Sequence, residues 1–354
     1  MEETTVIIVG QGLAGTWLSY WFADAGISFR LIDQSIQQSA SLKAAGLINP
    51  VTGRRMVTTW MIDELMPFAA NAYRKIGDFL GETVLEDTSV IDFFPSVQML
   101  QAFQKRYEED PRYLSAGINR EQYAEWFRYE FGWGAIHPCL LVDVNKLLVS
   151  WRKWLEGKGW LSEAVYDPSR LTVNEKGLTY ADIQFSYLIF CDGKSSAESP
   201  FFANLPFALN KGEGLLVEII GLPPHQVFKK GLSLVPYGEN VFWLGSTYEW
   251  TFQNDQPTTV FRQQAESWLT HFIKQPYRIL EHFAALRPAT LERRPFVGFH
   301  PQYPSIGILN GLGTKGCSLA PYFAHNLVSY LQGLGEIHPL ADVRRFEKIL
   351  GRPS

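Results

Sequence analysis

The sequence predicts an α/β protein in which a parallel sheet covered by helices is interleaved with a second region built on a mixed sheet. Three observations carry this expectation. A strand, a glycine-rich turn, a helix and another strand follow one another in the first 33 residues. A later strand ends in glycine at 187–193, and residues 206–284 contain short apolar runs separated by Pro and Gly turns. The length of 354 residues also favours two interleaved domains over one core.

The composition is that of an ordinary folded protein, with 46% hydrophobic and 19% charged residues. The formal net charge is −4, from 32 Lys and Arg against 36 Asp and Glu, and basic residues do not gather in one stretch, so nucleic acid is not an expected partner. The three cysteines form no CxxC pair, so neither a disulfide framework nor a metal site is predicted. Without a signal-peptide pattern or an apolar run near the roughly 20 residues of a membrane span, we expect a cytoplasmic protein.

The first forty residues predict a βαβ unit that binds a dinucleotide. Val6–Val9 is a β-branched run typical of a buried parallel strand, and the GxGxxG sequence Gly10–Gly15 follows it directly. A helix is predicted over Thr16–Ala25 and a second strand over Ile27–Ile32, ending on Asp33. Strand, glycines, helix, strand and acid therefore occur in the order that dinucleotide binding requires.

Each part of this unit has a physical role. Gly10 makes the tight turn, Gly12 lets the backbone approach a pyrophosphate, and Gly15 lets the helix pack closely on the strand. The helix N-terminus offers free N–H groups to the phosphates, and Asp33 is placed to accept hydrogen bonds from a ribose. The predicted cofactor contacts here are Gly10, Gly12, Leu13, Ala14, Gly15, Asp33 and Gln34. This fingerprint alone does not decide between FAD and NAD.

Residues 140–205 are predicted to complete the same sheet. A helix over Asn145–Glu156 is followed by a strand around Ala164 to Tyr166, where Val165 is expected to contact an adenine. The segment Tyr187–Gly193, YLIFCDG, resembles the strand that returns to the Rossmann sheet in FAD enzymes of the glutathione-reductase type. The end of that strand passes near the dinucleotide, which implies contacts from Cys191, Asp192 and Gly193.

Residues 206–284 favour antiparallel strands that cover one side of a substrate pocket. We predict strands at Gly214–Ile220, Leu232–Val235 and Val241–Gly245, and a helix over Val260–Phe272. Further on, a strand at Ile306–Asn310 leads into a second glycine-rich loop, GLGTKG, and a helix over Ser318–Leu331. Because this loop precedes a helix, it suits an anion or a developing negative charge.

Five motifs in this order resemble the D-amino-acid-oxidase-like family of FAD-dependent oxidoreductases, which includes glycine oxidase and sarcosine oxidase. They are VIIVGQGLAG with Asp33, AAGLINP, YLIFCDG, LRPAT…RPFVG and GLGTKG…AP. The resemblance covers nearly the whole chain. It implies a Rossmann-type FAD-binding domain over 1–75, 140–205 and 285–354, and a mixed β-sheet substrate domain over 76–139 and 206–284. The implied reaction oxidises the C–N bond of a small amine or amino acid to an imine by hydride transfer to the flavin.

The resemblance also assigns roles to particular residues. Arg287 in LRP matches the family arginine that binds the substrate carboxylate, and its planar fork suits that task. Lys315 lies in the loop that reaches the pyrimidine end of the flavin, where a cation favours the anionic reduced form. Arg54 and Arg55 are candidates to supply positive charge to flavin or substrate. The remaining implied cofactor contacts are Ala45, Gly46, Leu47, Gly311, Gly313, Thr314, Lys315 and Gly316. No general base is assigned, because hydride loss from a neutral amine depends on orientation more than on a base.

The chain departs from the family pattern at three places. Leu312 stands where many relatives have histidine, and the tyrosine that some relatives use against the substrate carboxylate falls near Ser233. No cysteine lies near Leu286, the place where sarcosine oxidase attaches its flavin, so we expect non-covalent FAD. Cys317, beside the flavin loop, is expected to be a small buried residue.

Three other functions remain open from the sequence. A NAD-dependent dehydrogenase is disfavoured by the glycine-rich C-terminal loop. The loop GLGTKGCSLAP is similar to the flavin domain of the bifunctional enzyme that removes a carboxymethyl group from a tRNA wobble uridine, but the methyltransferase partner domain is absent from this sequence. A flavin-binding protein without turnover of its own is the third alternative. The sequence leaves the substrate, the electron acceptor and the oligomeric state open.

Overall fold

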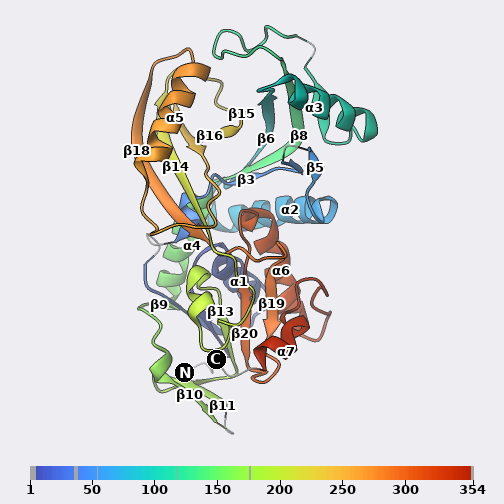
Figure 1. The fold of residues 1–354 in the computed structure, drawn as a ribbon. Helices are drawn as coiled ribbons and strands as arrows, with labels where there is room; N and C mark the ends of the chain where they lie inside the picture. The colour runs from blue at the N-terminus through green and yellow to red at the C-terminus, as the bar shows by residue number, and fades with distance from the viewer. Residues whose placement is uncertain (1–4, 36–38, 54, 118, 175–176, 352–354) are drawn as a thin grey trace.

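Two large sheets organise the molecule and lie in different halves of it (Figure 1). The computed structural model describes residues 5–35, 39–53, 55–117, 119–174 and 177–351. The six-stranded sheet has the order β19-β20-β13-β1-β2-β9, and the other sheet has the order β18-β14-β17-β16-β15-β6-β8-β3 with β7 paired to β8. A small sheet of β10, β11 and β12 and a hairpin of β4 and β5 complete the described strands.

The six-stranded sheet contains β1 (Val6–Val9), β2 (Phe29–Asp33), β9 (Leu161–Glu163), β13 (Tyr187–Phe190), β19 (Phe296–Phe299) and β20 (Ile306–Asn310). The larger sheet contains β3 (Leu47–Ile48), β6 (Leu85–Phe93), β7 (Leu114–Ala116), β8 (Trp133–Val142), β14 (Asn210–Ile219), β15 (Gln226–Lys230), β16 (Leu232–Gly238), β17 (Val241–Gly245) and β18 (Tyr277–Arg287). The short strands are β4 (Val51–Thr52), β5 (Val57–Thr58), β10 (Leu171–Asn174), β11 (Gly177–Tyr180) and β12 (Ile183–Phe185). The described α-helices are α1 (Leu13–Asp24), α2 (Ile62–Leu80), α3 (Val97–Glu109), α4 (Val144–Lys158), α5 (Thr259–Phe272), α6 (Gly316–Leu331) and α7 (Glu347–Leu350).

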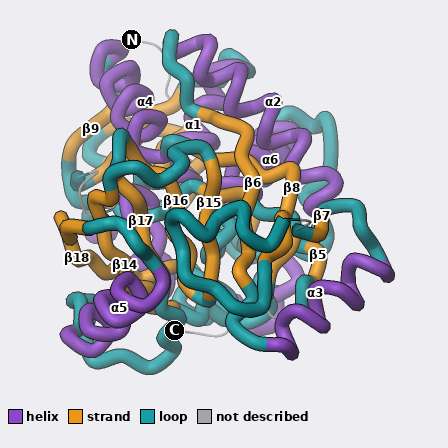
Figure 2. The backbone as a smooth tube through the Cα atoms, turned by 90° about the horizontal axis from the view of Figure 1, so that it is seen from above, coloured by secondary structure: helices purple, strands orange, loops and turns teal. Residues whose placement is uncertain are grey.

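Strand β1 is the centre of the six-stranded sheet. All four of its residues are buried, and it pairs in parallel with β13 on one side and β2 on the other. Helix α1 is apolar almost all round because it packs against both α4 and α6, and the Trp21 indole N–H donates to the Pro321 carbonyl at 2.9 Å. Figure 2 shows α1, α2, α4 and α6 gathered on one side of the molecule. A helix buried on several sides holds the glycine turn in a fixed place.

The larger sheet has two faces of different character. On β14 the odd-numbered side chains Leu215, Val217 and Ile219 pack in one core with α5. The even-numbered positions Asn210, Gly212 and Gly214 pair with alternate residues of β18, from Arg287 to Phe283. Because paired residues share a face, the arginine lies on the glycine-bearing face, opposite the helix-covered one.

The prediction of a strand around Ala164 to Tyr166 is wrong. Strand β9 covers Leu161–Glu163 instead, and the next N–H, of Ala164, donates to the Asp33 carbonyl at 3.0 Å. The chain then leaves the sheet, and Tyr166 stacks on Tyr180 of β11 with 5.1 Å between ring centroids. Tyr166 therefore packs against the small sheet and does not pair with a strand of the six-stranded sheet.

The other predicted elements are present. Strands β1, β17 and β20 have the predicted ends, and the rest have shifted ends. Helix α1 begins at Leu13 and α6 at Gly316, so both glycine-rich loops run directly into their helices. Strand β18 crosses the predicted boundary between 284 and 285, and β3 joins the larger sheet from within 1–75. The exact domain division therefore stays a prediction. Among the helices that the structure describes, none is both long and apolar enough to cross a membrane.

Candidate active site

The turn after β1 is tight enough that two of its glycines cannot be replaced without a shift. Gly10 has φ +97°, and a Cβ on it would lie 2.6 Å from the Cys191 carbonyl oxygen. A Cβ on Gly15 would lie only 1.8 Å from the Gly10 carbonyl oxygen. Gly12 faces only the hydroxyls of Ser41 and Ser39, and the Ser41 Oγ accepts the Leu13 N–H at 3.1 Å. The start of α1 therefore carries no bulky side chain at its glycines, and the Ser41 hydroxyl is bonded to its first N–H. A glycine-rich helix start of this kind lets a phosphate approach the backbone.

Asp33 is held by two partners at the end of β2. Its Oδ1 accepts the Gln11 N–H at 2.9 Å, and its Oδ2 accepts from Arg152 Nη1 at 2.8 Å. Arg152, on α4, is 7% exposed and also donates to the Gln11 side-chain oxygen and to Glu163. The sequence analysis missed Arg152, because nothing local distinguishes it from the other basic residues of a helix. Its contacts orient the carboxylate that is expected to meet a ribose.

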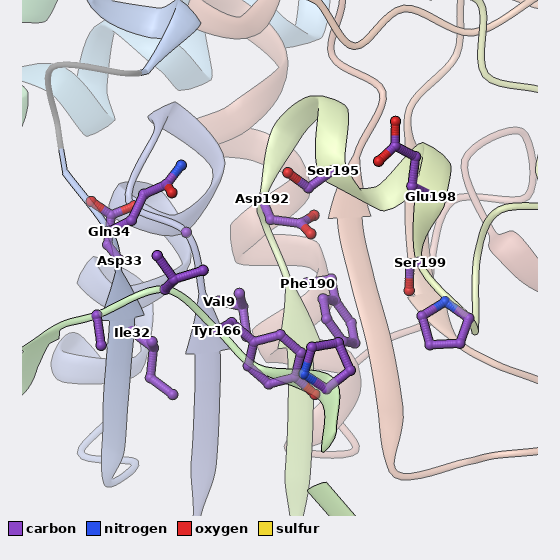
Figure 3. Close-up of a pocket in the computed structure, with 15 residues that line it drawn as sticks. Val9, Ile32, Asp33, Gln34, Tyr166, Phe190, Asp192, Ser195, Glu198 and Ser199 are labelled. Atoms are coloured by element: carbon purple, nitrogen blue, oxygen red, sulfur yellow. The ribbon is translucent and has the colours of Figure 1, made fainter. Parts of the chain in front are cut away.

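A cleft of about 210 Å³ opens at the carboxyl ends of β1, β2 and β13. Figure 3 shows Asp33 and Gln34 above the end of β2 and Asp192 and Ser195 across the cleft above β13. Its described lining is Val9, Gly10, Ile32, Asp33, Gln34, Ala164, Val165, Tyr166, Pro168, Phe190, Asp192, Ser195, Glu198, Ser199 and Pro200. Three of these residues are acidic and none is basic. Such a cleft at the strand ends of an open sheet suits a nucleoside without an extra phosphate on its ribose.

Asp192 is a buried acid on this cleft. Burial raises its pKa to about 6, although the hydrogen bond from the Ser196 hydroxyl opposes the rise. Asn310 Nδ2 donates to the Gly193 carbonyl and the Ser196 hydroxyl, both at 2.9 Å, so it ties the end of β20 to the end of β13. Cys191 is also buried, and burial raises the pKa of its thiol. Of the predicted contacts Cys191, Asp192 and Gly193, the first two have backbone atoms within 2.9 Å of the Cβ position of Gly10.

The AAGLINP segment is fastened to the larger sheet. Gly46 has φ +79°, a Cβ on it would lie 2.0 Å from the Val142 carbonyl oxygen, and the Val142 N–H donates to the Gly46 carbonyl at 3.0 Å. Leu47 then pairs with Leu141 in β3. Ala45 and Leu47 are half-buried beside this anchor. The segment is thereby held at the β3 edge of the larger sheet.

The second glycine-rich loop lies against the LRPAT segment. The Gly313 N–H donates to the Pro288 carbonyl at 3.1 Å, and Gly311, with φ +74°, has its Cβ position 2.6 Å from Thr290 Cγ2. Gly316 begins α6, and its Cβ position lies 3.1 Å from Leu13 Cδ1 at the start of α1. The two glycine-rich loops therefore begin helices whose first turns are in contact.

Arg287 ends β18 as a half-buried cation with neutral partners. Its Nη1 donates to Asn210 Oδ1 at 2.8 Å and to the Thr247 carbonyl at 3.1 Å, and its Nη2 donates to Ser246 Oγ at 2.8 Å. The Tyr248 ring covers it, with 5.1 Å between the guanidinium carbon and the ring centroid. Within the described ranges no carboxylate forms an ion pair with it, and burial lowers its pKa. Gly212 makes room, since a Cβ there would lie 1.8 Å from Nη2.

Lys315 is a second half-buried cation close by. Its pKa is lowered by burial and then by the nearby charges of Arg294 and Arg293. Its neighbour Thr314 shares a hydrogen bond of 3.0 Å with the Tyr248 hydroxyl, which joins the second glycine-rich loop to the cover of Arg287. The regions of Arg287 and Lys315 are thus connected through Tyr248 and Thr314.

The remaining predicted residues lie as follows. Arg54 is outside the described residues, and Arg55 is exposed. Cys317 is buried, as expected, and its carbonyl accepts from the Tyr73 hydroxyl at 3.0 Å. In the part of the chain that the structure describes, no three His, Cys, Asp or Glu side chains gather as metal ligands. Tyr248 and Asn210 were missed by the sequence analysis, because only the pairing of β14, β17 and β18 brings them to Arg287.

These features fit FAD. Three features suit its adenosine and pyrophosphate: the glycine-rich start of α1, the oriented Asp33, and a cleft whose described lining has no basic residue. The cationic end beyond the second glycine-rich loop suits a flavin ring that gains negative charge on reduction.

Comparison with known proteins agrees with this fit. A family model described as FAD dependent oxidoreductase (DAO) matches residues 5–330. Glycine oxidase from Pseudomonas aeruginosa is 21% identical over 362 residues, covering 93% of this chain and 94% of that protein. The structure of iminodiacetate oxidase from Chelativorans sp. superposes with a TM-score of 0.74 at 20% identity, covering 97% of this chain and 98% of the other. Glycine oxidase from Geobacillus kaustophilus gives a TM-score of 0.79 at 15% identity, covering 96% and 97%.

Proposed function

This chain belongs to the DAO family of FAD-dependent oxidoreductases, and we propose that it oxidises the C–N bond of a small amino acid or N-substituted amino acid whose carboxylate Arg287 binds. FAD is its cofactor. The observation that carries the proposal is the half-buried Arg287 guanidinium, whose partners are all uncharged. A half-buried cation without a counter-charge has lost part of its hydration, and such groups concentrate at binding sites.

The hydrogen bonds of Arg287 leave room for a carboxylate. A guanidinium carries five N–H donors, and Asn210, Thr247 and Ser246 accept three of them. Two donors suffice for the bidentate pair that arginine forms with a carboxylate. The neutral partners hold the guanidinium in place without cancelling its charge. They support the assignment of Arg287 as the group that orients the substrate.

The main role that we propose for the side chains is to orient the substrate. With the substrate carboxylate on Arg287, the neutral amine loses the hydrogen of its α-carbon with two electrons, and the C–N bond becomes an iminium. Bound FAD supplies the two-electron acceptor for this step. Water then adds to the iminium and releases an oxo acid and an amine. Lys315 adds positive charge near the reacting region, which favours a product state with more negative charge.

The named relatives narrow the substrate class that we propose. Glycine oxidase and iminodiacetate oxidase are named for substrates that share an N–CH2–COO⁻ unit. An N-carboxymethyl amine meets the requirement of a carboxylate one carbon from the C–H bond that breaks. We therefore propose amines of this type, with glyoxylate as the released acid.

The experiment compares Arg287→Ala with the wild type, and Arg262→Ala serves as a control because that arginine is on α5, away from the site. We expect Arg287→Ala to lower kcat/KM for the best N-carboxymethyl amine by about 100-fold or more, the loss of two charge-assisted hydrogen bonds. FAD content should remain at one per chain. Unchanged kcat/KM in the variant contradicts the assignment.

A further inference from the structure

Glu213 is a buried charged residue that the proposed reaction does not use. It lies on β14 next to Gly212, but on the face of the larger sheet that α5 covers (Figure 1). Its side chain is fully buried, and the Lys211 ammonium, itself on a 2% exposed side chain, lies 3.4 Å from its Oε1. A buried carboxylate is costly unless several donors stabilise it, so the other donors around Glu213 indicate what it holds in place.

The Glu213 carboxylate binds Thr258 with both of its oxygens. Its Oε2 accepts the Thr258 N–H at 2.6 Å, and its Oε1 accepts from the Thr258 hydroxyl at 2.9 Å. The same hydroxyl accepts the Phe261 N–H at 3.2 Å, so Thr258 is the N-cap of α5. His282 Nε2, on β18, also lies 3.0 Å from Oε2. Because a helix N-terminus favours a negative charge, this position suits a carboxylate.

The backbone of Glu213 binds Thr247, at the other end of the loop that connects β17 to α5. Its N–H donates to Thr247 Oγ1 at 2.9 Å, and its carbonyl accepts the Thr247 N–H at 3.4 Å. We call residues 247–258 the covering loop, because they include Tyr248, whose ring covers Arg287. Both ends of the covering loop are therefore bound to Glu213, the first end by its backbone and the second by its carboxylate.

The first end of the covering loop is also a partner of Arg287. The Thr247 carbonyl accepts from Arg287 Nη1 at 3.1 Å, while the N–H and the hydroxyl of Thr247 are bonded to Glu213. The next residue, Tyr248, has its ring centroid 5.1 Å from the guanidinium carbon. A displacement of the covering loop therefore moves a hydrogen-bond acceptor of Arg287 and its aromatic cover together.

Between its two ends the covering loop is mostly exposed. Trp250 is 50% exposed and meets Tyr248 edge to face, with 5.9 Å between ring centroids. Asp255 lies 3.1 Å from the Lys194 ammonium, and both side chains are about half-exposed. Exposed ion pairs contribute little to stability. The buried contacts at Glu213 therefore hold the loop more strongly than this ion pair does.

We propose that Glu213 is a positioning residue, which acts through the covering loop to hold the Arg287 guanidinium in the orientation that binds a substrate carboxylate. Lys211 supplies the counter-charge that a buried carboxylate needs. This inference rests on the proposed function for the ligand of Arg287. It assigns Glu213 no contact with the substrate.

Three variants separate the hydrogen bonds of Glu213 from its charge. Lys211→Met removes the counter-charge and keeps the carboxylate on Thr258. Lys211→Met/Glu213→Gln, the glutamine variant, removes both charges, but the Gln amide can accept the Thr258 N–H and donate to the Thr258 hydroxyl. Lys211→Met/Glu213→Leu, the leucine variant, removes both charges and both hydrogen bonds. Of the three, the leucine variant alone is expected to release the second end of the covering loop.

Limited digestion of the holoenzyme with chymotrypsin measures this release and needs no substrate. The covering loop contains Tyr248, Trp250 and Phe252, after which chymotrypsin cleaves, and mass spectrometry identifies cuts at these places. We expect the leucine variant to be cut there about tenfold faster than the wild type, because the rate follows the fraction of open loop. The glutamine variant should stay within about threefold of the wild type. Lys211→Met should stay within about twofold, although loss of the counter-charge lowers its melting temperature.

Titration of the same proteins with acetate measures the effect on Arg287. Acetate is a carboxylate without an amine, and the change in the flavin absorption of the holoenzyme reports its Kd. We expect an about tenfold higher Kd in the leucine variant and values within about threefold of the wild type in the other two. FAD content should stay at one per chain in all three. Because Lys211→Met is destabilised and keeps its affinity, the comparison distinguishes positioning from a general loss of stability.

Three results overturn the inference. The first is a leucine variant whose loop is cut at the wild-type rate. The second is a leucine variant that is cut faster and binds acetate as tightly as the wild type. The third is an equal loss of acetate affinity in Lys211→Met and in the leucine variant, because reduced stability would then explain both.

Thr258→Ala tests the same contact if the leucine variant does not accumulate as holoenzyme. It removes the hydroxyl bonded to Glu213 and keeps the N–H. We expect about threefold faster cutting of the covering loop and an about threefold higher Kd for acetate. Ser96→Ala is the matched control, since it removes the N-cap of α3 instead. Equal behaviour of these two variants would also overturn the inference.

Arg287→Ala separates this inference from the proposed function. If acetate binds to Arg287→Ala as tightly as to the wild type, the proposed function fails and the positioning role falls with it. If Arg287→Ala weakens acetate binding and the leucine variant does not, the inference about Glu213 fails and the proposed function stands. Weakened binding in both supports the two together.

Discussion

The nucleotide end and the substrate end of the candidate active site differ in how their charges are compensated. At the nucleotide end, around the GxGxxG turn and the end of β2, Asp33 is paired with Arg152 at 2.8 Å. At the substrate end, Arg287 meets only neutral acceptors, and Lys315 has other cations as neighbours. An ion pair holds a side chain in one orientation, in which it can accept a hydrogen bond from a polar ligand. A partly buried charge without an ion pair favours a ligand of opposite sign. The first end therefore fits a cofactor that stays, and the second fits an anionic substrate that comes and goes.

The largest effect is expected at the nucleotide end. Gly15→Ala places a Cβ 1.8 Å from the Gly10 carbonyl oxygen, so α1 must move away from the turn. We expect the purified variant to contain less than about a tenth of the wild-type FAD, as read from the flavin absorption, since the phosphate cradle depends on this packing. Gly157→Ala is the matched control, because its Cβ position has no neighbour within 4 Å. Full FAD content in Gly15→Ala would show that the turn is not the cofactor cradle.

The next effect separates the two ends. Gly212→Ala puts a Cβ 1.8 Å from Arg287 Nη2 and displaces the guanidinium without removing it. We expect kcat/KM for the best carboxylated substrate to fall by about 100-fold while FAD content stays at the wild-type level. Equal losses of FAD and activity would mean that the substitution near Arg287 also disturbs FAD binding, so the two ends would not act independently.

The third prediction concerns the Asp192 carboxyl group, a buried acid at the nucleotide end. Its pKa is about 6 in the folded apoprotein against 3.8 for an ordinary aspartate, so the folded state holds the proton more tightly than the unfolded state. Stability is therefore highest below pH 4 on this account and declines as pH rises from 4 to 6, by on the order of 2 kcal/mol. We expect Asp192→Asn to raise the melting temperature of the apoprotein at pH 7.5. The two proteins should differ less at pH 4.5, and a constant difference across this range would contradict the raised pKa.

The smallest effect concerns Arg152. Arg152→Gln removes the ion pair with Asp33 but leaves the Gln11 N–H bonded to the other carboxylate oxygen. We expect about tenfold weaker FAD binding, measured by flavin fluorescence on titration of the apoprotein, with kcat at saturating FAD unchanged. Arg262→Gln should leave the Kd at the wild-type value. A change in kcat at full FAD occupancy would mean that Arg152 acts on more than the orientation of Asp33.

The two ends also differ in how much of each could be predicted from the sequence. Gly10, Gly15 and Asp33 were candidates from the sequence because the order of strand, glycines, helix, strand and acid fixes their spacing. The close packing at Gly10 and Gly15 is compatible with the roles predicted for these two residues, which stay predictions. Arg287 and Lys315 were candidates only through the family resemblance, and their roles stay predictions. Asn210, Ser246 and Tyr248 could not be found this way. They reach Arg287 through the register of β14 against β18 and the loop after β17, which no local pattern encodes.

The most direct test of the account is the absorption spectrum of the purified protein during anaerobic addition of N-carboxymethyl amines, with their methyl esters as matched controls. We predict a flavin spectrum that bleaches with glycine, N-methylglycine or N-(carboxymethyl)glycine and does not bleach with the esters at equal concentration. A protein that binds no FAD, or a flavin that the esters reduce as readily as the acids, would contradict the account.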